Sequence, residues 1–456
     1  MSATNRRDFL KGAAFLGTVA SIPELEASTG SVPLLRVAVM SDIQGYPYPE
    51  DAGMRNLERA LDVLAPLKPD VVVNDGDIND TGNDMDAVAY YKARCDARLG
   101  RLEHVSCMGN HEIGFIPKER QSIRTSAVCL REFNTIFGYS PDSWLVHRVI
   151  GGHDFIALSL SRIEGYTDEE IAALKSALDA AVARDAKRPI FVVTHYHPLE
   201  TVNDSRSESQ GGGLRRLLDC YPQVVSISGH THNPLQDPRS IWQGTFTAVD
   251  SSTLCYGCIS IEPPAANQIS CLIPYGHEAV GFMLIEVYAD RLVFRRFTAR
   301  DRRELEPNRP WSVPWPHDAS QTRYSFERRS AEEHPPQFVG DPEPTLWYDF
   351  GYVYLMFSAA EPKERVFGYR IELTEDGEGK APASCFHLAD YYRIPEHRQS
   401  RVVFKTPPGS LSAGRSYRCR IFPVGFFGRE GRPTAWHFAV KAGYPCRADC
   451  PSCVQE

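Results

Sequence analysis

Residues 71–77 read Val-Val-Val-Asn-Asp-Gly-Asp, an apolar run that ends in a glycine and a carboxylate. Short valine-rich runs of this kind are typical of strands buried on both faces of a parallel sheet. Five such runs occur before residue 233, and each ends in side chains that bind metals. The clusters after the five runs are Ser41-Asp42-Ile43-Gln44, Gly76-Asp77, Gly109-Asn110-His111-Glu112, Thr194-His195-Tyr196-His197 and Gly229-His230-Thr231-His232.

Strand and helix patterns alternate from about residue 34 to residue 299. The strands before residue 233 are predicted at Leu34–Met40, Val71–Asn74, His104–Met108, Ile190–Thr194 and Val224–Ser228. Between the first two, Leu57, Leu61 and Leu64 repeat at the spacing of one helix face. Thr167 and Glu170 have the spacing of a capping box, which predicts the start of another helix.

The pattern changes after His232, where strand signals follow one another without helices between them. They cover Ile241–Val249, Thr253–Ile261, Ala279–Val287 and Leu292–Thr298. A β-rich part that packs against an α/β part predicts an α/β domain over residues 31–300. The expected architecture is a four-layer α/β/β/α sandwich of two mixed sheets.

All five clusters fall at the carboxyl ends of predicted strands, where open α/β sheets place their ligands. Aspartate and asparagine oxygens together with histidine nitrogens suit Mn, Fe or Zn better than they suit soft metals. Two divalent cations about 3.5–4 Å apart repel each other, and a carboxylate shared by both offsets that repulsion. The clusters therefore predict a site for two divalent metal ions, and such a site usually performs hydrolysis.

In this order and spacing, the clusters resemble the calcineurin-like metallophosphoesterase family over about residues 34–299. The resemblance implies a metal-dependent phosphoric ester hydrolase with two divalent ions (Mn, Fe or Zn, with Mg as a further candidate). It implies attack on a phosphomonoester or phosphodiester by a metal-bridging hydroxide, with His111 as the general acid. The implied metal ligands are Asp42, Asp77 as the bridging carboxylate, Asn110, His195, His230 and His232.

Two positions leave alternatives open. The family carries a histidine two residues after its first aspartate, where this chain has Gln44. Because an amide oxygen is a weaker donor than imidazole, Gln44 is either a ligand of a weakened first site, favouring Mn or Mg, or the holder of a water. The fourth run is followed by both His195 and His197, and His195 is preferred because it comes directly after the strand. Asp75 lacks a preceding glycine and is interpreted as a supporting or turn residue.

The second half of the chain is predicted to be all β. Residues 301–341 are rich in Pro, Arg and Glu and are interpreted as a linker. Strand signals at short spacing over residues 342–443 predict a small β-sandwich. The order of Trp347, Gly368-Tyr369-Arg370-Ile371 and the stretch from Leu411 to Tyr417 resembles a fibronectin type III domain.

The positions of the cysteines are compatible with free thiols, disulfides or a metal site. Cys107 lies in an apolar run and is expected to be a buried free thiol. The tail, residues 444–456, contains Cys446, Cys450 and Cys453, and Cys255 and Cys258 form a second cluster. Disulfides, free thiols and a zinc site that takes a ligand from elsewhere all fit these spacings.

The first 30 residues have the pattern of an export signal. The stretch Asn5-Arg6-Arg7-Asp8-Phe9-Leu10-Lys11 resembles a bacterial Tat signal. The apolar run from Gly12 to Ala20 is too short to cross a bilayer. The resemblance implies the Tat translocase as a partner, a periplasmic or extracellular location, and no transmembrane segment in the mature chain.

Composition narrows the range of partners. The formal net charge of −8 argues against a general basic surface, so no nucleic-acid partner is expected. The expected partner is a small-molecule or surface-linked phosphoester. Arg120, Arg124 and Arg206, in two loops next to the predicted site, are candidates for holding an anionic group of the substrate.

Two alternative functions belong to other classes. Gln44 and the C-terminal sandwich are compatible with a surface binding or structural protein whose metal site is degenerate. By analogy, a sandwich domain that docks on a surface also fits a phosphodiesterase acting on a glycan- or lipid-linked phosphate. Metal content and turnover distinguish these classes, whereas no single residue decides between monoester and diester.

Overall fold

The computed structural model describes residues 32–81, 85–114, 125–202, 208–261, 269–349, 352–377 and 380–442. The described residues from Pro33 onward belong to one compact unit. The expected export signal, the loop residues Arg120, Arg124 and Arg206, and the tail cysteines lie outside the described residues. Within the described ranges, no helix combines the length and the apolar character needed to cross a membrane.

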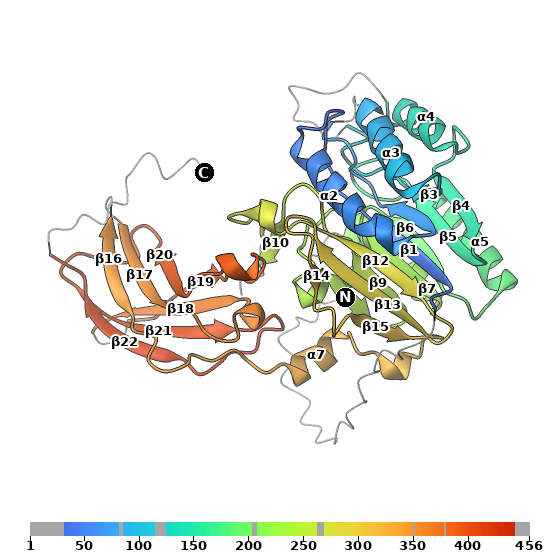
Figure 1. Cartoon of the computed structure of the whole chain (residues 1–456). Coiled ribbons are helices and arrows are strands. Elements are labelled where there is room, and N and C mark those ends of the chain that lie inside the picture. The colour runs from blue at the N-terminus through green and yellow to red at the C-terminus, as the bar shows by residue number, and fades with distance from the viewer. Residues whose placement is uncertain are drawn as a thin grey trace. The chain divides into compact units, whose positions relative to one another are not determined.

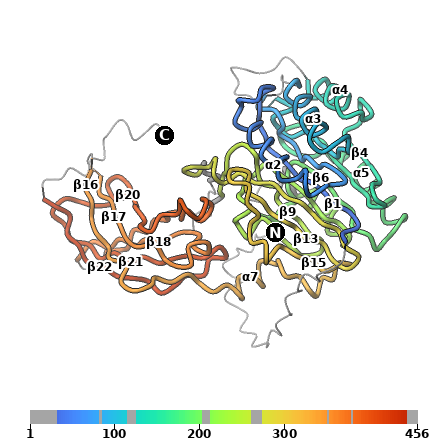
Figure 2. Tube along the Cα trace, in the orientation of Figure 1, coloured from blue at the N-terminus to red at the C-terminus, as the bar shows by residue number. Residues whose placement is uncertain are grey.

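The first sheet is built from the valine-rich runs. β1 (Leu35–Val39), β2 (Val71–Asn74) and β3 (Glu103–Ser106) are parallel neighbours. On the other side of β1 lie β12 (Gly281–Val287) and β13 (Arg291–Thr298), which form an antiparallel hairpin. The sheet is therefore mixed, and strands far apart in the sequence lie side by side in it (Figures 1 and 2).

The second sheet is also mixed. Its strands, in spatial order, are β4 (Leu145–Ile150), β5 (His153–Leu158), β6 (Ile190–Thr194), β7 (Val224–Ser228), β9 (Thr247–Asp250) and β8 (Ile241–Gln243). The four central strands are parallel, whereas β4 and β8 pair antiparallel with their neighbours. The single strand predicted over residues 241–249 is divided, because the chain turns at Gly244 and β8 pairs back onto β9.

Helices cover the outer faces of both sheets. Those that pack on the first sheet are α2 (Ala52–Leu67), α3 (Met85–Leu99) and α4 (Ser126–Phe137), and those on the second are α5 (Asp168–Arg184) and α6 (Glu208–Leu218) (Figure 1). Leu57, Leu61 and Leu64 are all buried, as their spacing predicts. The capping box of Thr167 and Glu170 is present at the start of α5.

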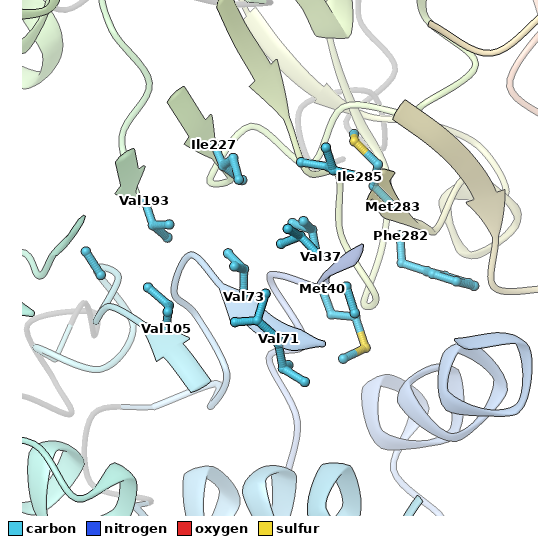
Figure 3. Close-up of a cluster of buried hydrophobic side chains, with 14 of the residues drawn as sticks. Val37, Met40, Val71, Val73, Val105, Val193, Ile227, Phe282, Met283 and Ile285 are labelled. Atoms are coloured by element: carbon cyan, nitrogen blue, oxygen red, sulfur yellow. The ribbon is translucent and has the colours of Figure 1, made fainter. Parts of the chain in front are cut away.

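Apolar side chains fill the space between the two sheets. Figure 3 shows Val193 and Ile227 from the second sheet facing Val37, Val73 and Ile285 from the first. All five are fully buried. Burial of each such side chain contributes about 1.5–3 kcal/mol, so this layer holds the sheets together. The domain is the four-layer α/β/β/α sandwich that the sequence predicted.

Part of the segment expected to be a linker belongs to the first sheet. β14 (Glu304–Leu305) and β15 (Trp311–Pro314) pair antiparallel with β13. Trp311 is buried beneath the guanidinium of Arg296, whose Cζ lies 4.1 Å from the ring centroid. A short helix, α7 (Phe326–Glu332), follows. A second expectation also changes: of Thr253–Ile261 only β10 (Cys258–Ile261) is a strand, which pairs with β11 (Ile269–Leu272).

The C-terminal region consists of two antiparallel sheets. One contains β16 (Thr345–Asp349), β17 (Tyr352–Ser358) and β20 (Arg401–Lys405), and the other contains β19 (Ala383–Leu388), β18 (Gly368–Glu375), β21 (Ser416–Val424) and β22 (Thr434–Ala439). Tyr417 accepts a hydrogen bond from the Ser412 backbone N–H (2.8 Å), the tyrosine corner of such sandwiches. Trp347 is 47% exposed and packs on Tyr354 outside the core.

The packing of α2 generates a test of the first domain. A Cβ added at Gly53 would overlap the backbone carbonyl of Ile43, which lies between Asp42 and Gln44. A backbone carbonyl cannot move away from the added Cβ as the end of a flexible side chain can. We therefore expect Gly53→Ala to lower the free energy of unfolding by about 1–3 kcal/mol, measured by urea denaturation.

Gly213→Ala in α6 is the matched control. The nearest atom to its added Cβ is the Ile171 Cγ1, at 3.7 Å, which is ordinary contact. We expect this substitution to stabilise the protein by up to about 1 kcal/mol, because alanine restricts the unfolded chain. Equal effects of the two substitutions would contradict the close approach at Gly53.

Candidate metal centre

Five loops at the carboxyl ends of β1, β2, β3, β6 and β7 carry the predicted site residues. Several of these residues have left-handed backbone, which non-glycine residues rarely adopt. They are Asp42 (φ 47°), Gln44 (φ 43°), Asp77 (φ 53°), His230 (φ 69°) and His232 (φ 55°). Such conformations cost on the order of 1–3 kcal/mol each and cluster at functional sites. The surrounding contacts must therefore hold each loop in place.

Carboxylate and imidazole groups from these loops form two groups that share Asp77. Asp42, Asp77 and His232 make up the first group, and Asp77, His195 and His230 the second. Within each group the candidate ligand atoms all lie within 4.8 Å of one another. Only His230 is partly exposed, and the other four side chains are buried. Two groups with a common carboxylate are the arrangement that a dinuclear metal site requires.

The remaining predicted residues lie beside these groups. The Asn110 Oδ1 is 2.9 Å from the His195 Nε2, next to the second group. The Gln44 Nε2 is 3.4 Å from the His232 Nε2, next to the first. The His111 Nε2 is 3.8 Å from the Asp77 Oδ2. The structure thus brings the seven predicted ligands and His111 together, whereas His197 belongs to neither group of the described residues.

Three of the histidines are oriented in the same way, by a backbone carbonyl on Nδ1. The pairs are His195 with the carbonyl of Asp75 (2.9 Å), His232 with that of Tyr256 (2.9 Å) and His111 with that of Asp80 (2.7 Å). A carbonyl oxygen only accepts hydrogen bonds, so each ring donates from Nδ1. Each Nε2 then faces the other site residues, where it can bind a metal or move a proton.

Glycines allow two of the loops to approach the carboxylates. A Cβ added at Gly109 would overlap the Asp77 Oδ1, and one added at Gly229 would overlap the Asp42 Oδ2. Any other residue at these positions would displace a candidate ligand. The Gly-Asn and Gly-His pairs in the sequence therefore have a steric cause.

Glu112 is a supporting residue whose role the sequence did not reveal. Its side chain is wholly buried and accepts hydrogen bonds from four backbone N–H groups. The donors are Asp77 (2.9 Å), Ile78 (2.6 Å), Asn79 (3.2 Å) and Gly109 (2.7 Å). One carboxylate thus ties the loop after β2 to the loop after β3. The sequence feature that could have indicated this role is the position of Glu112 directly after His111, inside a cluster of predicted ligands.

Two further buried carboxylates lie under the site. Burial and the neighbouring Asp42 raise the pKa of Asp75 to about 7. Burial also raises the pKa of Asp250 well above its ordinary value. Asp250 accepts hydrogen bonds from the Thr231 hydroxyl and from the Ser252 N–H (2.8 Å), which steadies the loop between His230 and His232. Asp250 is the last residue of β9, and the predicted ligands likewise come at the ends of their strands. This position in the sequence could have identified Asp250 as a site residue.

Neighbouring histidines and the central carboxylate Asp77 shift each other's pKa values. Although burial opposes the charged form, Asp77 raises the pKa of His195 to about 10. The pKa of His111 is also raised, because Asp77 and Asp80 outweigh burial. Burial opposes ionisation of Asp77 as well, yet the two histidines lower its pKa. Burial and the charge on His195 hold the pKa of His230 well below its usual range, so His230 is neutral.

The raised pKa of His195 predicts proton release on metal binding. A histidine must be neutral to bind a metal, and below pH 10 His195 carries a proton in the metal-free protein. We expect about one proton per chain to be released from His195 between pH 7 and pH 9, and the apparent Mn affinity to rise about tenfold per pH unit. Calorimetric titrations with Mn in buffers of different ionisation enthalpy measure this release, and buffer-independent heats would contradict it.

The four hydrogen bonds to Glu112 predict a loss of metal affinity when its charge is removed. In Glu112→Gln, an amide N–H₂ group would replace one acceptor and face backbone donors. We expect Mn affinity to fall by about 10–100-fold, measured by titration with the metal. Glu103→Gln, at the exposed start of β3, is the control and should bind Mn as the wild type does.

Comparisons with known proteins bear on the first domain. Residues 35–234 match the family model described as calcineurin-like phosphoesterase. No curated protein matches the chain. GAP50, the anchor in the inner membrane complex of Plasmodium, is a similar solved structure with 13% identity, covering 66% of this chain and 95% of that one (TM-score 0.39). The purple acid phosphatase PPD1 from yellow lupin (Lupinus luteus) seeds has 12% identity, covering 62% of this chain and 55% of that one (TM-score 0.44).

A fibronectin III domain is also among the similar solved structures. The third fibronectin III domain of the human KIAA0343 protein has 13% identity, and the likeness covers 25% of this chain and 87% of that domain (TM-score 0.19).

The family match begins at β1 and ends just after His232, so it includes all five loops of the site. Over this range, residues 35–234, the chain is similar to the calcineurin-like phosphoesterase family.

Proposed function

We propose that this chain is a dinuclear metal-dependent phosphoesterase that hydrolyses a phosphomonoester or a phosphodiester. The observation that carries the proposal is the sharing of Asp77 by two groups of candidate ligands. A structural site for a single ion would need only one closed group. The match to the calcineurin-like phosphoesterase family supports the same reaction class.

The donor set suits two divalent ions. In our assignment Asp42, Asp77 and His232 would hold the first ion, and Asp77, Asn110, His195 and His230 would hold the second. Gln44 lies next to the first group. Asp42 and Asp77 are almost completely buried, and their ion-pair partners within the described part of the chain are histidines. Buried carboxylates require compensating cations, which bound metals would provide. When bound, the ions supply Lewis acidity toward the phosphoryl group.

His111 is assigned as the general acid. The neighbouring Asp77 and Asp80 raise its pKa, which favours the protonated ring that a general acid requires. The side chain is 18% exposed, so it can reach a substrate, while the Asp80 carbonyl fixes Nδ1. A cationic imidazole here would stabilise the phosphoryl oxygens and donate a proton from Nε2 to the departing alkoxide.

We further propose that the enzyme works outside the cytoplasm on a small or surface-linked phosphoester. The support is the Tat-like stretch within residues 1–30 and the net charge of −8. Arg120, Arg124 and Arg206 remain the candidates for substrate contacts, on the basis of their place in the sequence. A panel of aryl monoesters, aryl diesters and cyclic nucleotides would identify the ester class.

Two variants separate the metal site from the general acid. Asp77→Asn is expected to lose both ions and all turnover, because both groups depend on its carboxylate. His111→Ala should keep both ions but lose about 10²–10⁴-fold in kcat on the best substrate of the panel. Elemental analysis measures the metal content, and chelation followed by added Mn tests the dependence on metal. The exposed His437→Ala in β22 is the control. Full turnover by either site variant would refute the assigned roles.

A further inference from the structure

Gln44 stands where the family has a histidine ligand, and its surroundings suggest a different task. The residue is 6% exposed and lies on the loop after β1 with φ 43°. Backbone hydrogen bonds hold this loop along the one that carries Asp77: Gln44 N–H donates to the Asp77 carbonyl (2.9 Å), and Gly45 N–H to that of Ile78 (3.0 Å). The backbone of Gln44 is thus fixed against the loop that carries Asp77.

The amide of Gln44 lies nearer to the general acid than to the candidate ligand. Its Nε2 is 3.0 Å from the His111 Nε2 and 3.4 Å from the His232 Nε2. His111 already donates from Nδ1 to the Asp80 carbonyl. In the neutral ring, Nε2 is then an acceptor, and the Gln44 N–H₂ group supplies the donor that it needs. Both nitrogens of His111 therefore have partners.

The same loop also supports the other side of the His111 ring. Tyr46, two residues after Gln44, donates from its hydroxyl to the Asp80 Oδ2 (2.8 Å). Asp80 in turn presents its carbonyl to the His111 Nδ1 at 2.7 Å. Residues 44–46 thus hold the ring directly at Nε2 and through Asp80 at Nδ1. The other charged groups near the ring are Asp77, Glu112 and the Asp80 carboxylate (3.9 Å from Nδ1).

We propose that Gln44 is a positioning residue for His111, which it orients through the hydrogen bond to Nε2, and that it does not take the place of the histidine ligand. The inference rests on the proposed function, since it concerns the general acid of that reaction. A carboxamide carries a donor and an acceptor on the same carbon, so by rotation it can meet Nε2 with or without a proton. A carboxylate offers acceptors alone, and an aliphatic side chain offers neither.

Leaving-group dependence tests this role. Gln44→Leu and Gln44→Glu are compared with wild type on 4-nitrophenyl and alkyl esters of the class that the wild type hydrolyses, at saturating Mn. We expect both variants to bind as much Mn as wild type. Their kcat on the alkyl ester should fall about tenfold, but on the 4-nitrophenyl ester only about two- to threefold, because a good leaving group needs little help from an acid. Gln321→Leu, at an exposed position, is the control.

Two outcomes would overturn the proposal. In the first, Gln44→Leu loses about one Mn per chain and excess Mn restores its activity, while Gln44→Glu remains fully active. This combination would identify Gln44 as a metal ligand. The other is an equal loss of kcat on the two esters, which would indicate a general structural defect. The expected pattern requires instead a selective loss on the alkyl ester that added Mn does not restore.

A second readout is independent of turnover. In metal-free protein labelled with ¹⁵N-histidine, loss of the Gln44 hydrogen bond should shift the His111 Nε2 signal, which is identified by its absence in His111→Ala. An unchanged signal in Gln44→Leu would overturn the positioning role. If the wild type hydrolyses no ester but this shift is observed, the proposed function fails while the hydrogen bond stands, so the two failures are distinguishable.

Discussion

The shared carboxylate of Asp77 is the constraint on which the site depends. Its Oδ1 accepts the His111 backbone N–H (2.9 Å), its Oδ2 lies 3.2 Å from the His195 Nε2, and its own N–H donates to Glu112 (2.9 Å). One residue in a left-handed conformation thus connects the loops after β2, β3 and β6. Because these strands belong to both sheets, the packing between the sheets sets the distance between the two groups of ligands.

Charge is the second constraint at this edge of the domain. Asp42, Asp75, Asp77, Glu112 and Asp250 are all buried. In the metal-free protein, a proton on His195 compensates Asp77, the pKa of His111 is raised, and burial raises the pKa of Asp75, Glu112 and Asp250. Bound cations would take over that compensation. Folding and metal binding are therefore coupled in this domain, and its stability is expected to depend on both pH and metal concentration.

Sequence patterns predicted most of the first domain because each depends on near neighbours. Leu57, Leu61 and Leu64 lie on one buried face of α2, and Thr167 caps α5 through Glu170, three residues away. The patterns were less informative where pairing with distant strands decides the outcome. β15 comes from a Pro- and Trp-rich stretch and becomes a strand by pairing with β13.

For the site, the sequence by itself determined which residue types follow the five strands, and therefore the class of chemistry. Only the tertiary structure decided how these residues are grouped. Asp77 becomes common to two groups, Glu112 joins two loops, and Gln44 comes within 3.0 Å of His111, 67 positions away in the chain. The physical reason is that ligand chemistry belongs to each side chain, whereas hydrogen bonds and metal geometry depend on distances that the packing of two sheets sets.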